Sequence, residues 1–158
     1  MTVQITEMTA DDVEAVYEIE KSSFNNPWSL EDIRKTIDEE YGYIYKPYVA
    51  KDENGNICGF VIVMIVSDEA EIADIAVDPA SRGIGIGKLL LCYALDYAKS
   101  YGITNIYLEV RETNEVAKSL YISSGFEPVG VRRNYYKNPT EDAIVMKNTL
   151  SDKKKEQI

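Results

Sequence analysis

Closely spaced glycines follow an arginine in the segment from Arg82 to Gly87, which reads RGIGIG. Because glycine has no Cβ atom, backbone N–H groups in such a segment can approach a ligand closely. An apolar-striped stretch begins directly afterwards at Lys88 and predicts a helix. The first amides of a helix lack partners within it, and its dipole is positive at that end. The segment therefore predicts a cradle for an anionic group, most often phosphate.

Two common nucleotide-binding motifs do not fit this segment. A Walker loop that used Gly87 and Lys88 would need glycine at position 82 and serine or threonine at 89, where the chain has Arg82 and Leu89. The dinucleotide fingerprint would need its third glycine at position 88 or 90, which are Lys88 and Leu90. A cradle for another phosphate-bearing ligand and a glycine-rich connection without a ligand remain as alternatives.

Histidine is absent from the 158 residues. This removes the usual general base, the Ser-His and Cys-His nucleophile pairs and the commonest zinc ligand, so acid–base chemistry must use carboxylate, tyrosine, lysine or cysteine. Cys58 and Cys92 both stand in apolar surroundings, which predicts two buried free thiols rather than a disulfide or a metal pair. No metal site is expected.

The composition describes a soluble globular protein, with 45% hydrophobic and 28% charged residues. A net charge of −10 argues against broad nucleic-acid binding, and it favours cationic partners such as ribosomal proteins, although many acidic proteins carry such a charge only for solubility. The longest apolar run, 60–66, is too short to cross a bilayer, and no targeting segment is visible. We expect a cytoplasmic protein.

Hydrophobic periodicity and turn residues predict one α/β domain over residues 1–150 and a disordered charged tail at 151–158. Helices are expected at about 13–24, 30–37, 86–101 and 114–124, and strands at about 3–5, 43–51, 57–66, 70–77, 106–110, 127–133 and 142–149. The strand–loop–helix–strand order around the glycines implies a parallel pair with antiparallel pairing on either side. The expected architecture is a mixed, mostly antiparallel seven-stranded sheet with helices on both faces.

Several further segments extend the pattern around the glycines in a fixed order. They are Ile75–Pro79, Leu108–Arg111, the Asn-x-x-Ala-x-x-Leu-Tyr-x-x-x-Gly-Phe run from Asn114 to Phe126, Asn26–Ser29, Arg133–Tyr136 and Glu141–Ala143. In this order and spacing, residues 2–148 resemble the GNAT acetyltransferases. Within that family they are most similar to the protein N-terminal acetyltransferases, especially those acting on the N-terminal alanine of a ribosomal protein and their archaeal relatives.

The resemblance implies acetyl-CoA as the acetyl donor, with its pyrophosphate on the amides of residues 83–88 and its pantetheine arm along residues 75–77 as if it were an added strand. The amide of Val77 would then face the thioester carbonyl as its oxygen becomes negative. Asn114 contacts CoA in the family, and it also suits the N-cap of the following helix; both roles can hold together. The implied donor-binding residues are Ile75, Ala76, Val77, Arg82, Gly83, Ile84, Gly85, Ile86, Gly87, Lys88 and Asn114.

Acetyl transfer to an amine needs a neutral nitrogen and a protonated leaving thiolate. The resemblance assigns Tyr121 as the general acid, while its residue type and helical spacing alone favour a packing role beside Val116, Ala117 and Leu120. Glu109 stands where the subfamily has its base, acting through water; the alternative is an ion pair with Arg111 or another cation. An α-amine with a pKa near 7.7–8.0 is already about a tenth neutral at pH 7, unlike lysine, so a modest base suffices for N-terminal substrates.

The acceptor pocket implied by the resemblance uses two distant regions. Phe24, Pro27 and Trp28 belong to the connection between the first two helices, where the family contacts the first residues of the peptide. Tyr135 and Tyr136 are expected in the last β–β loop, with one of them facing the substrate. Trp28 can instead act as a hydrophobic staple beside a capping Ser29.

The sequence therefore predicts an enzyme that transfers acetyl from acetyl-CoA to protein N-termini, ribosomal proteins among them, in a direct ternary complex. Two alternatives remain: a lysine or small-amine acetyltransferase on the same fold, and an acyl-CoA-binding subunit without turnover. The combination of Glu109 and Tyr121 disfavours the subunit, and Trp28 with the tyrosine pair disfavours a small amine. The preferred first residue of the acceptor and the oligomeric state are open.

Overall fold

The computed structural model describes residues 2–38, 40–41 and 44–150. Its elements are β1 (Gln4–Glu7), α1 (Val13–Ser23), α2 (Leu30–Lys35), β2 (Tyr45–Lys51), β3 (Ile57–Val66), β4 (Glu69–Val77), α3 (Ile86–Ser100), β5 (Asn105–Arg111), α4 (Glu115–Ser123), β6 (Glu127–Tyr136) and β7 (Glu141–Thr149). The expected tail at 151–158 and the expected strand start at Tyr43 lie outside the described residues.

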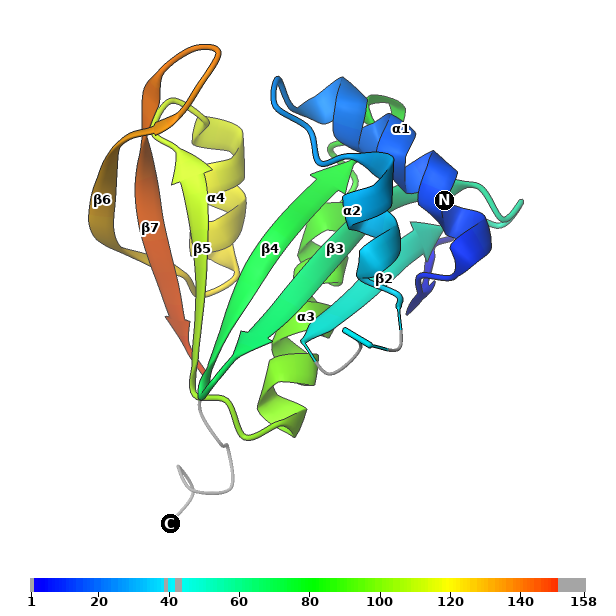
Figure 1. The fold of residues 1–158 in the computed structure, drawn as a ribbon, viewed down its shortest axis with the longest axis horizontal. Helices are drawn as coiled ribbons and strands as arrows, with labels where there is room; N and C mark the ends of the chain where they lie inside the picture. The colour runs from blue at the N-terminus through cyan, green and yellow to red at the C-terminus, as the bar shows by residue number, and fades with distance from the viewer. Residues whose placement is uncertain (1, 39, 42–43, 151–158) are drawn as a thin grey trace.

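The strands form one seven-stranded sheet in the order β1-β2-β3-β4-β5-β7-β6. β4 and β5 are parallel, and every other neighbouring pair is antiparallel, which confirms the predicted mixed sheet. Helices α1 and α2 cover one face, and α3 and α4 lie on the other (Figure 1). A sheet covered on both faces explains the unbroken apolar sequence of β3, because both sets of alternating side chains are buried.

Two hydrophobic clusters form the core, one on each face of the sheet. Phe60 and Ile62 of β3 point into the cluster beneath α1 and α2, while Val61 and Val63 point into the larger cluster beneath α3. All four side chains are fully buried. Trp28 packs against the first of these clusters at its edge.

Local sequence signals account for most element ends. The side-chain Oγ of Ser29 accepts the Asp32 N–H at 3.0 Å and caps α2, and the Asn114 Oδ1 accepts the Ala117 N–H at 3.1 Å and caps α4. Gly102 has a φ of +73° directly after α3, the left-handed conformation that commonly ends a helix. These caps confirm the predicted positions, although α2 ends at Lys35 and does not reach Ile37.

Three expectations about side-chain placement are wrong. Tyr135 and Tyr136 end strand β6 instead of lying in the loop, because the strand continues past the predicted limit at Arg133. Cys92 is a free thiol as predicted, but it is exposed on α3, whereas Cys58 is buried. Val116 does not belong to the packed stripe of α4, since 85% of it is exposed.

The parallel register between β4 and β5 is short. It consists of Ala70 opposite Ile106 and Glu71 opposite Tyr107, and beyond these positions the two strands diverge (Figure 1). On its other edge β4 stays paired with β3 as far as Val77, with an irregularity that leaves Ala73 without an opposing residue. A bulge of this kind bends and twists a strand. The carboxyl-terminal half of β4 therefore presents an edge that β5 does not cover.

Close packing of α3 against β3 leads to a stability prediction at Gly59. A Cβ atom at this position would lie 3.1 Å from the Ala76 carbonyl oxygen and 3.2 Å from the Leu90 Cδ1. We expect Gly59→Ala to lower the free energy of unfolding by about 1–3 kcal/mol, because the backbone contact cannot relax freely. Urea unfolding measures this. Gly130→Ala is the matched strand control, since a Cβ there meets nothing within 4 Å; equal stability of the two variants would contradict the packing argument.

Candidate active site

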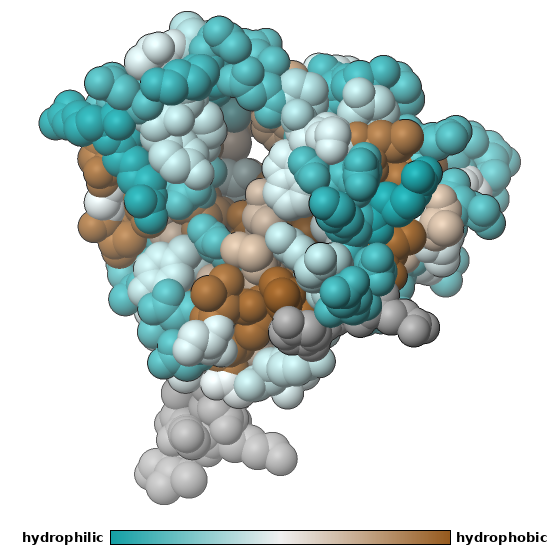
Figure 2. All heavy atoms as spheres, in the orientation of Figure 1, coloured by the Kyte–Doolittle hydropathy of each residue, from teal (hydrophilic) through white to brown (hydrophobic). Residues whose placement is uncertain are grey.

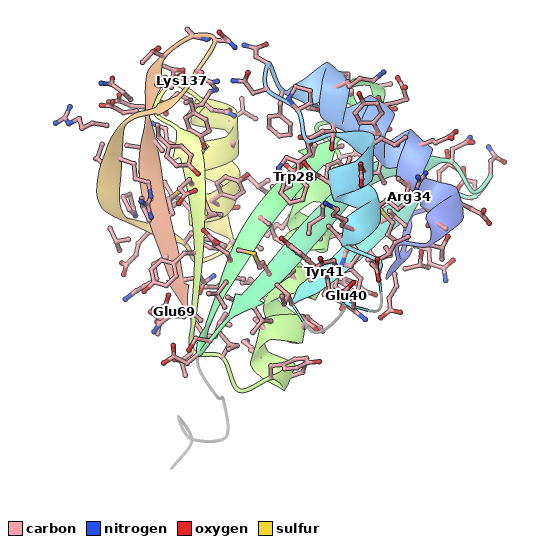
Figure 3. All side chains as sticks on the ribbon, viewed as in Figure 1. Trp28, Arg34, Glu40, Tyr41, Glu69 and Lys137 are labelled. Atoms are coloured by element: carbon pink, nitrogen blue, oxygen red, sulfur yellow. The ribbon has the colours of Figure 1, made fainter. Side chains whose placement is uncertain are left out.

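The divergence of β4 and β5 opens a site with two walls. The wall on the α1 side comprises β4 and the α1–α2 connection, which includes Trp28; the other comprises β5, α4 and the end of the β6–β7 hairpin, which includes Lys137 (Figure 3). Figure 2 shows the surface hollowed between them. We call these the β4 wall and the β5 wall.

The uncovered edge of β4 carries backbone groups that point into the opening. The Asp78 N–H bonds the Cys58 carbonyl of β3 at 2.9 Å. Since successive residues of a strand direct their N–H groups to opposite edges, the N–H of Val77 points toward the uncovered edge. This is the orientation expected for an amide that stabilises a developing oxyanion.

The glycine segment lies at the end of the same edge and begins α3. Gly83 and Gly85 have φ values of +85° and +90°, and a Cβ atom on either would meet nothing within 4 Å. Both glycines therefore leave open space beside the first amides of α3. The Arg82 guanidinium is directed inward, donating to the Val77 carbonyl at 3.0 Å and to the Ser23 Oγ at 3.3 Å. Arg82 thus ties the loop to β4 and α1.

Other members of the segment serve packing. The Ile86 side chain is buried in the larger core cluster, whereas Ile84 is exposed. A Cβ at Gly87 would lie 3.0 Å from the Leu120 Cδ2, so this glycine permits close approach of α4 to the start of α3. Lys88 is exposed on the first turn of α3.

Tyr121 is buried on α4 with 7% of its surface exposed, and its ring contacts Phe126 edge-on. Burial, with the nearby charge of Asp74 as a second cause, raises the pKa of its hydroxyl well above the ordinary value. The hydroxyl is therefore protonated throughout the neutral range and can donate a proton or a hydrogen bond. The two interpretations of Tyr121 from the sequence, as a packing residue and as a proton donor, are therefore compatible.

Glu109 lies on β5 and is paired with a different arginine from the one that sequence proximity suggests. The Arg132 Nε donates to its Oε1 at 3.1 Å, and burial together with the neighbouring Glu109 carboxylate raises the pKa of the Tyr135 hydroxyl. Glu71, at the point where β4 and β5 separate, is close enough that burial and the charge of Glu109 raise its pKa. Two carboxylates thus lie near Arg132, which pairs with Glu109, and this part of the site favours a further cationic group.

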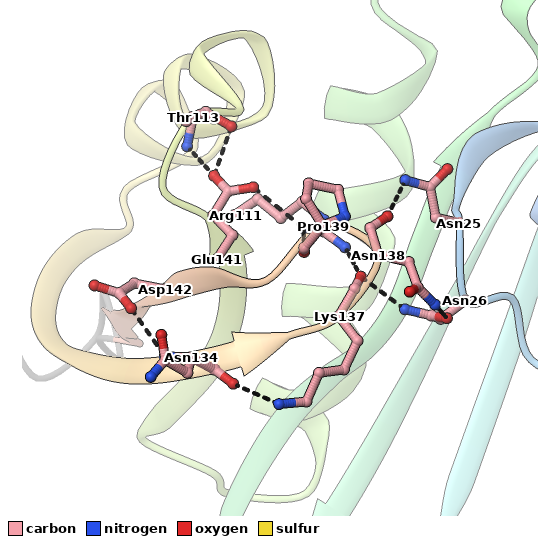
Figure 4. A network of polar contacts seen from close by, with 10 residues as sticks. All are labelled: Asn25, Asn26, Arg111, Thr113, Asn134, Lys137, Asn138, Pro139, Glu141 and Asp142. Carbon is pink, nitrogen blue, oxygen red and sulfur yellow. Dashed lines mark hydrogen bonds and ion pairs between the residues drawn. The ribbon is translucent and has the colours of Figure 1, made fainter.

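Arg111 organises the tip of the β5 wall. Its guanidinium donates to the carbonyls of Lys137 and Pro139 at 2.8 and 3.0 Å and pairs with Glu141, whose other oxygen accepts the Thr113 N–H at 2.7 Å (Figure 4). The same guanidinium lies 4.5 Å from the centre of the Tyr136 ring. Tyr136 therefore packs beneath Arg111, while the centre of the Tyr135 ring lies 5.9 Å from the Arg132 guanidinium carbon.

An amide contact, the asparagine clasp, joins the two walls. Asn26 donates from its Nδ2 to the Lys137 carbonyl at 2.9 Å and accepts from the Asn138 Nδ2 at 2.9 Å, and the Asn25 side chain donates to the Asn138 carbonyl (Figure 4). The clasp holds the α1–α2 connection against the turn of the β6–β7 hairpin. Phe24 and Pro27, the flanking residues of the predicted acceptor region, are exposed.

Trp28 has two neighbours beyond the core. Its backbone N–H donates to the Glu20 Oε2 at 2.9 Å. Its side chain also borders a groove of about 490 Å³ beside α2, which is further lined by Asp32, Lys35, Tyr41, Ile44 and Tyr45. The groove opens on the α2 side, and none of the donor-site residues lines it.

Two acidic residues in the β4 wall lie together although the sequence did not predict it. Glu20 of α1 is 1% exposed, and its carboxyl lies beside that of Asp74 of β4, which is half-buried. The detectable signal was a charged residue on the apolar stripe of α1 and another within the apolar sequence of β4. Their proximity was not detectable, because it depends on how α1 crosses the sheet.

The buried pair predicts a particular pH dependence of stability. Burial, followed by the hydrogen bond and charge of Glu20, raises the pKa of Asp74 above its ordinary value of 3.8, while the Ile75 N–H opposes this shift. The folded protein thus binds this proton more tightly than the unfolded chain. The resulting stabilisation is complete below about pH 3.8 and is lost as the pH rises toward the raised pKa.

An uncharged isostere removes that loss. We expect Asp74→Asn to raise the melting temperature relative to the wild type. The gain in the free energy of unfolding should grow by up to about 1.4 kcal/mol per pH unit between pH 5 and 8. Calorimetry across this range measures the effect, and Asp68→Asn, an exposed change in the β3–β4 turn, is the control. A gain that is constant with pH would contradict the protonated state of the pair.

Comparison with known proteins identifies the family of the chain. A profile described as the acetyltransferase (GNAT) family matches residues 13–126. The ribosomal protein bS18-alanine N-acetyltransferases of Haemophilus influenzae and Escherichia coli K12 are 39% and 37% identical, over 90% and 93% of this chain and 95% and 97% of theirs.

Solved structures show the same likeness. The crystal structure of the Escherichia coli ribosomal-protein-S18-alanine N-acetyltransferase has a TM-score of 0.84 at 34% identity, covering 96% of each chain. Ard1 from Thermoplasma volcanium has a TM-score of 0.86 at 26% identity, covering 96% of this chain and all of its own. The chain therefore belongs to the acetyltransferase (GNAT) family.

Proposed function

We propose that this protein transfers the acetyl group of acetyl-CoA directly to the α-amino group of a protein N-terminus, with a bS18-like ribosomal protein as the acceptor. One observation carries the proposal: the uncovered edge of β4 faces a second wall that bears a buried tyrosine and a carboxylate, Tyr121 and Glu109. The named relatives acetylate an N-terminal alanine of bS18, which supports this choice of acceptor.

We further propose that residues 1–150 form the single catalytic domain and that it acts in the cytoplasm, where ribosomal proteins are made. No helix in the described part of the chain is long and apolar enough to cross a membrane.

The donor is acetyl-CoA, which GNAT acetyltransferases use, and the residues present fit it. Open space at Gly83 and Gly85 beside the first amides of α3 suits a pyrophosphate, and the uncovered edge of β4 at residues 75–77 suits an amide-bearing arm. When bound, acetyl-CoA supplies an acetyl group activated as a thioester. We propose that Asn114, already the cap of α4, contacts it from the β5 wall.

Two side chains and one backbone amide then act on the reacting groups: the side chains transfer two protons, and the amide stabilises the developing negative charge. Glu109 accepts a proton from the α-ammonium through water, aided by the second carboxylate at Glu71. The N–H of Val77 donates to the carbonyl oxygen as negative charge accumulates there. Tyr121, kept protonated by burial, donates to the departing thiolate sulfur.

The asparagine clasp supports a chain end as acceptor. It bridges the α1–α2 connection and the β6–β7 turn, so a polypeptide cannot pass straight across the opening at that point. An N-terminus can enter end-on, with its first residue between Trp28 and Tyr135. The excess of carboxylates near Arg132 attracts its positive charge.

The glycine loop yields a binding prediction. We expect Gly85→Ala to weaken the affinity for CoA by about tenfold or more, because a Cβ atom occupies the ligand's space and disfavours the left-handed φ. Isothermal titration with CoA measures this. Gly55→Ala is the matched control, since Gly55 has a φ of +82° and equally open surroundings in the β2–β3 turn. Loss of affinity in both variants, or in neither, would argue against a cradle at residues 83–88.

The activity itself is tested with acetyl-CoA and a panel of hexapeptides with free N-termini, with internal-lysine peptides and polyamines as comparisons, by following free thiol. We expect turnover with N-terminal peptides, with alanine-initiated bS18-like sequences among the best. Turnover confined to lysine peptides or polyamines would refute the proposal. CoA binding without any turnover would indicate an acyl-CoA-binding subunit.

Assigned roles are tested in the same assay. Tyr121→Phe and Glu109→Gln should each lower kcat by about 10²–10⁴-fold, the usual contribution of general acid–base catalysis, with little change in CoA affinity. Tyr101→Phe, an exposed change at the end of α3, is the control for loss of a tyrosine hydroxyl. An unchanged kcat in either variant would reject the corresponding role.

A further inference from the structure

The buried acidic pair of the β4 wall has an unusual hydrogen-bond inventory. Among the described residues, the Glu20 Oε1 and the Asp74 Oδ2 are buried oxygens without a conventional donor. The two side chains lie close enough that Glu20, after burial, raises the pKa of the Asp74 carboxyl. Because carboxylates only accept hydrogen bonds, one proton held between the two groups is what would give these oxygens a partner.

The pair connects two segments that the reaction must hold together. The second oxygen of Glu20, Oε2, accepts the Trp28 N–H at 2.9 Å, and Trp28 belongs to the α1–α2 connection on the acceptor side. Asp74 directly precedes residues 75–77, the uncovered edge of β4. The Trp28 backbone is thus hydrogen-bonded to Glu20, and the Glu20 carboxyl adjoins that of Asp74 at the start of the donor-side segment of β4.

Stability alone does not explain this arrangement. Buried carboxyl groups are costly to desolvate, and replacing buried ionic or polar pairs with apolar residues of similar volume is often neutral or stabilising. The acidic pair adjoins the apolar cluster beneath α1, which already holds this helix against the sheet through Val16, Ile19 and Phe60. Hydrogen bonds add what those contacts lack, which is a defined direction and distance for the Trp28 backbone.

We propose that Glu20 and Asp74 form a positioning pair that fixes the Trp28 segment relative to the uncovered edge of β4, and thereby places the acceptor N-terminus beside the acetyl donor. The proposal rests on the proposed function of the site. It assigns neither residue a contact with substrate. Loss of the pair should release the acceptor side and leave donor binding unchanged, because the donor segments at 75–77 and 82–88 contribute no side chain to the pair and β4 stays paired with β3 as far as Val77.

Trp28 provides a direct readout, since it is the single tryptophan of the chain. Acrylamide quenching of its fluorescence in the free protein reports how firmly the segment is held, without any need for turnover. We expect Glu20→Ala and Asp74→Ala to increase quenching. They should also raise the KM for the acceptor peptide by about tenfold, the value of one hydrogen bond to a charged group, with the KM for acetyl-CoA unchanged.

Conservative variants separate positioning from charge. Glu20→Gln keeps an acceptor for the Trp28 N–H and a donor for Asp74, and Asp74→Asn keeps a donor for Glu20, so both should retain quenching and peptide KM near the wild type. Glu18→Gln is the matched control on the exposed face of α1, where Glu18 pairs with Lys21. Amide variants that behave like the alanine variants would overturn the proposal.

An apolar double variant guards against a trivial loss of folding. Glu20→Met with Asp74→Leu removes the buried carboxyls while filling their volume, so the melting temperature should be retained or raised. We still expect greater quenching and a higher peptide KM, because the Trp28 N–H has lost its acceptor. Wild-type quenching in this stable double variant would overturn the positioning role. Absence of turnover with every peptide would instead contradict the proposed function, and the quenching result would still decide the role of the pair.

Discussion

The short parallel register between β4 and β5 is the constraint on which the rest of the site depends. Two residue pairs join the strands at one end, and each strand then continues with its other neighbour, β3 for β4 and β7 for β5. The sheet stays continuous, yet the far half of β4 has an uncovered edge. A fully paired sheet would have satisfied those backbone groups and left nowhere for an amide-bearing ligand to add a strand.

Such an opening needs contacts that keep its two walls at a fixed separation. The apolar clusters hold each wall to its own helices, and the asparagine clasp joins the two walls at their tips. Within the walls, Arg111 holds the tip of the β5 wall and Glu20 holds the Trp28 backbone in the β4 wall. Each of these contacts ends on a backbone group, so together they position segments and not only side chains.

Sequence patterns predicted what is local and missed what depends on crossing angles and register. The caps at Ser29 and Asn114 and the left-handed glycines follow from neighbouring residues, so the element order was predictable. The pairing of Glu109 with Arg132 depends on the register of β5, β7 and β6, so the sequence predicted an ion pair with Arg111 or another cation and did not single out Arg132. The predicted end of β6 at Arg133 was wrong for a related reason, since the length of the hairpin depends on the pairing of β6 with β7.

We propose above all that the opening between β4 and β5 delivers a chain end, and not a side chain, to the acetyl donor. The most direct measurement uses one peptide that offers both amines: an alanine-initiated hexapeptide with an internal lysine, incubated with the protein and isotopically labelled acetyl-CoA. Fragmentation mass spectrometry then locates the label. We expect label on the α-nitrogen of the first residue; label on the lysine ε-nitrogen would show that the opening delivers a side chain instead.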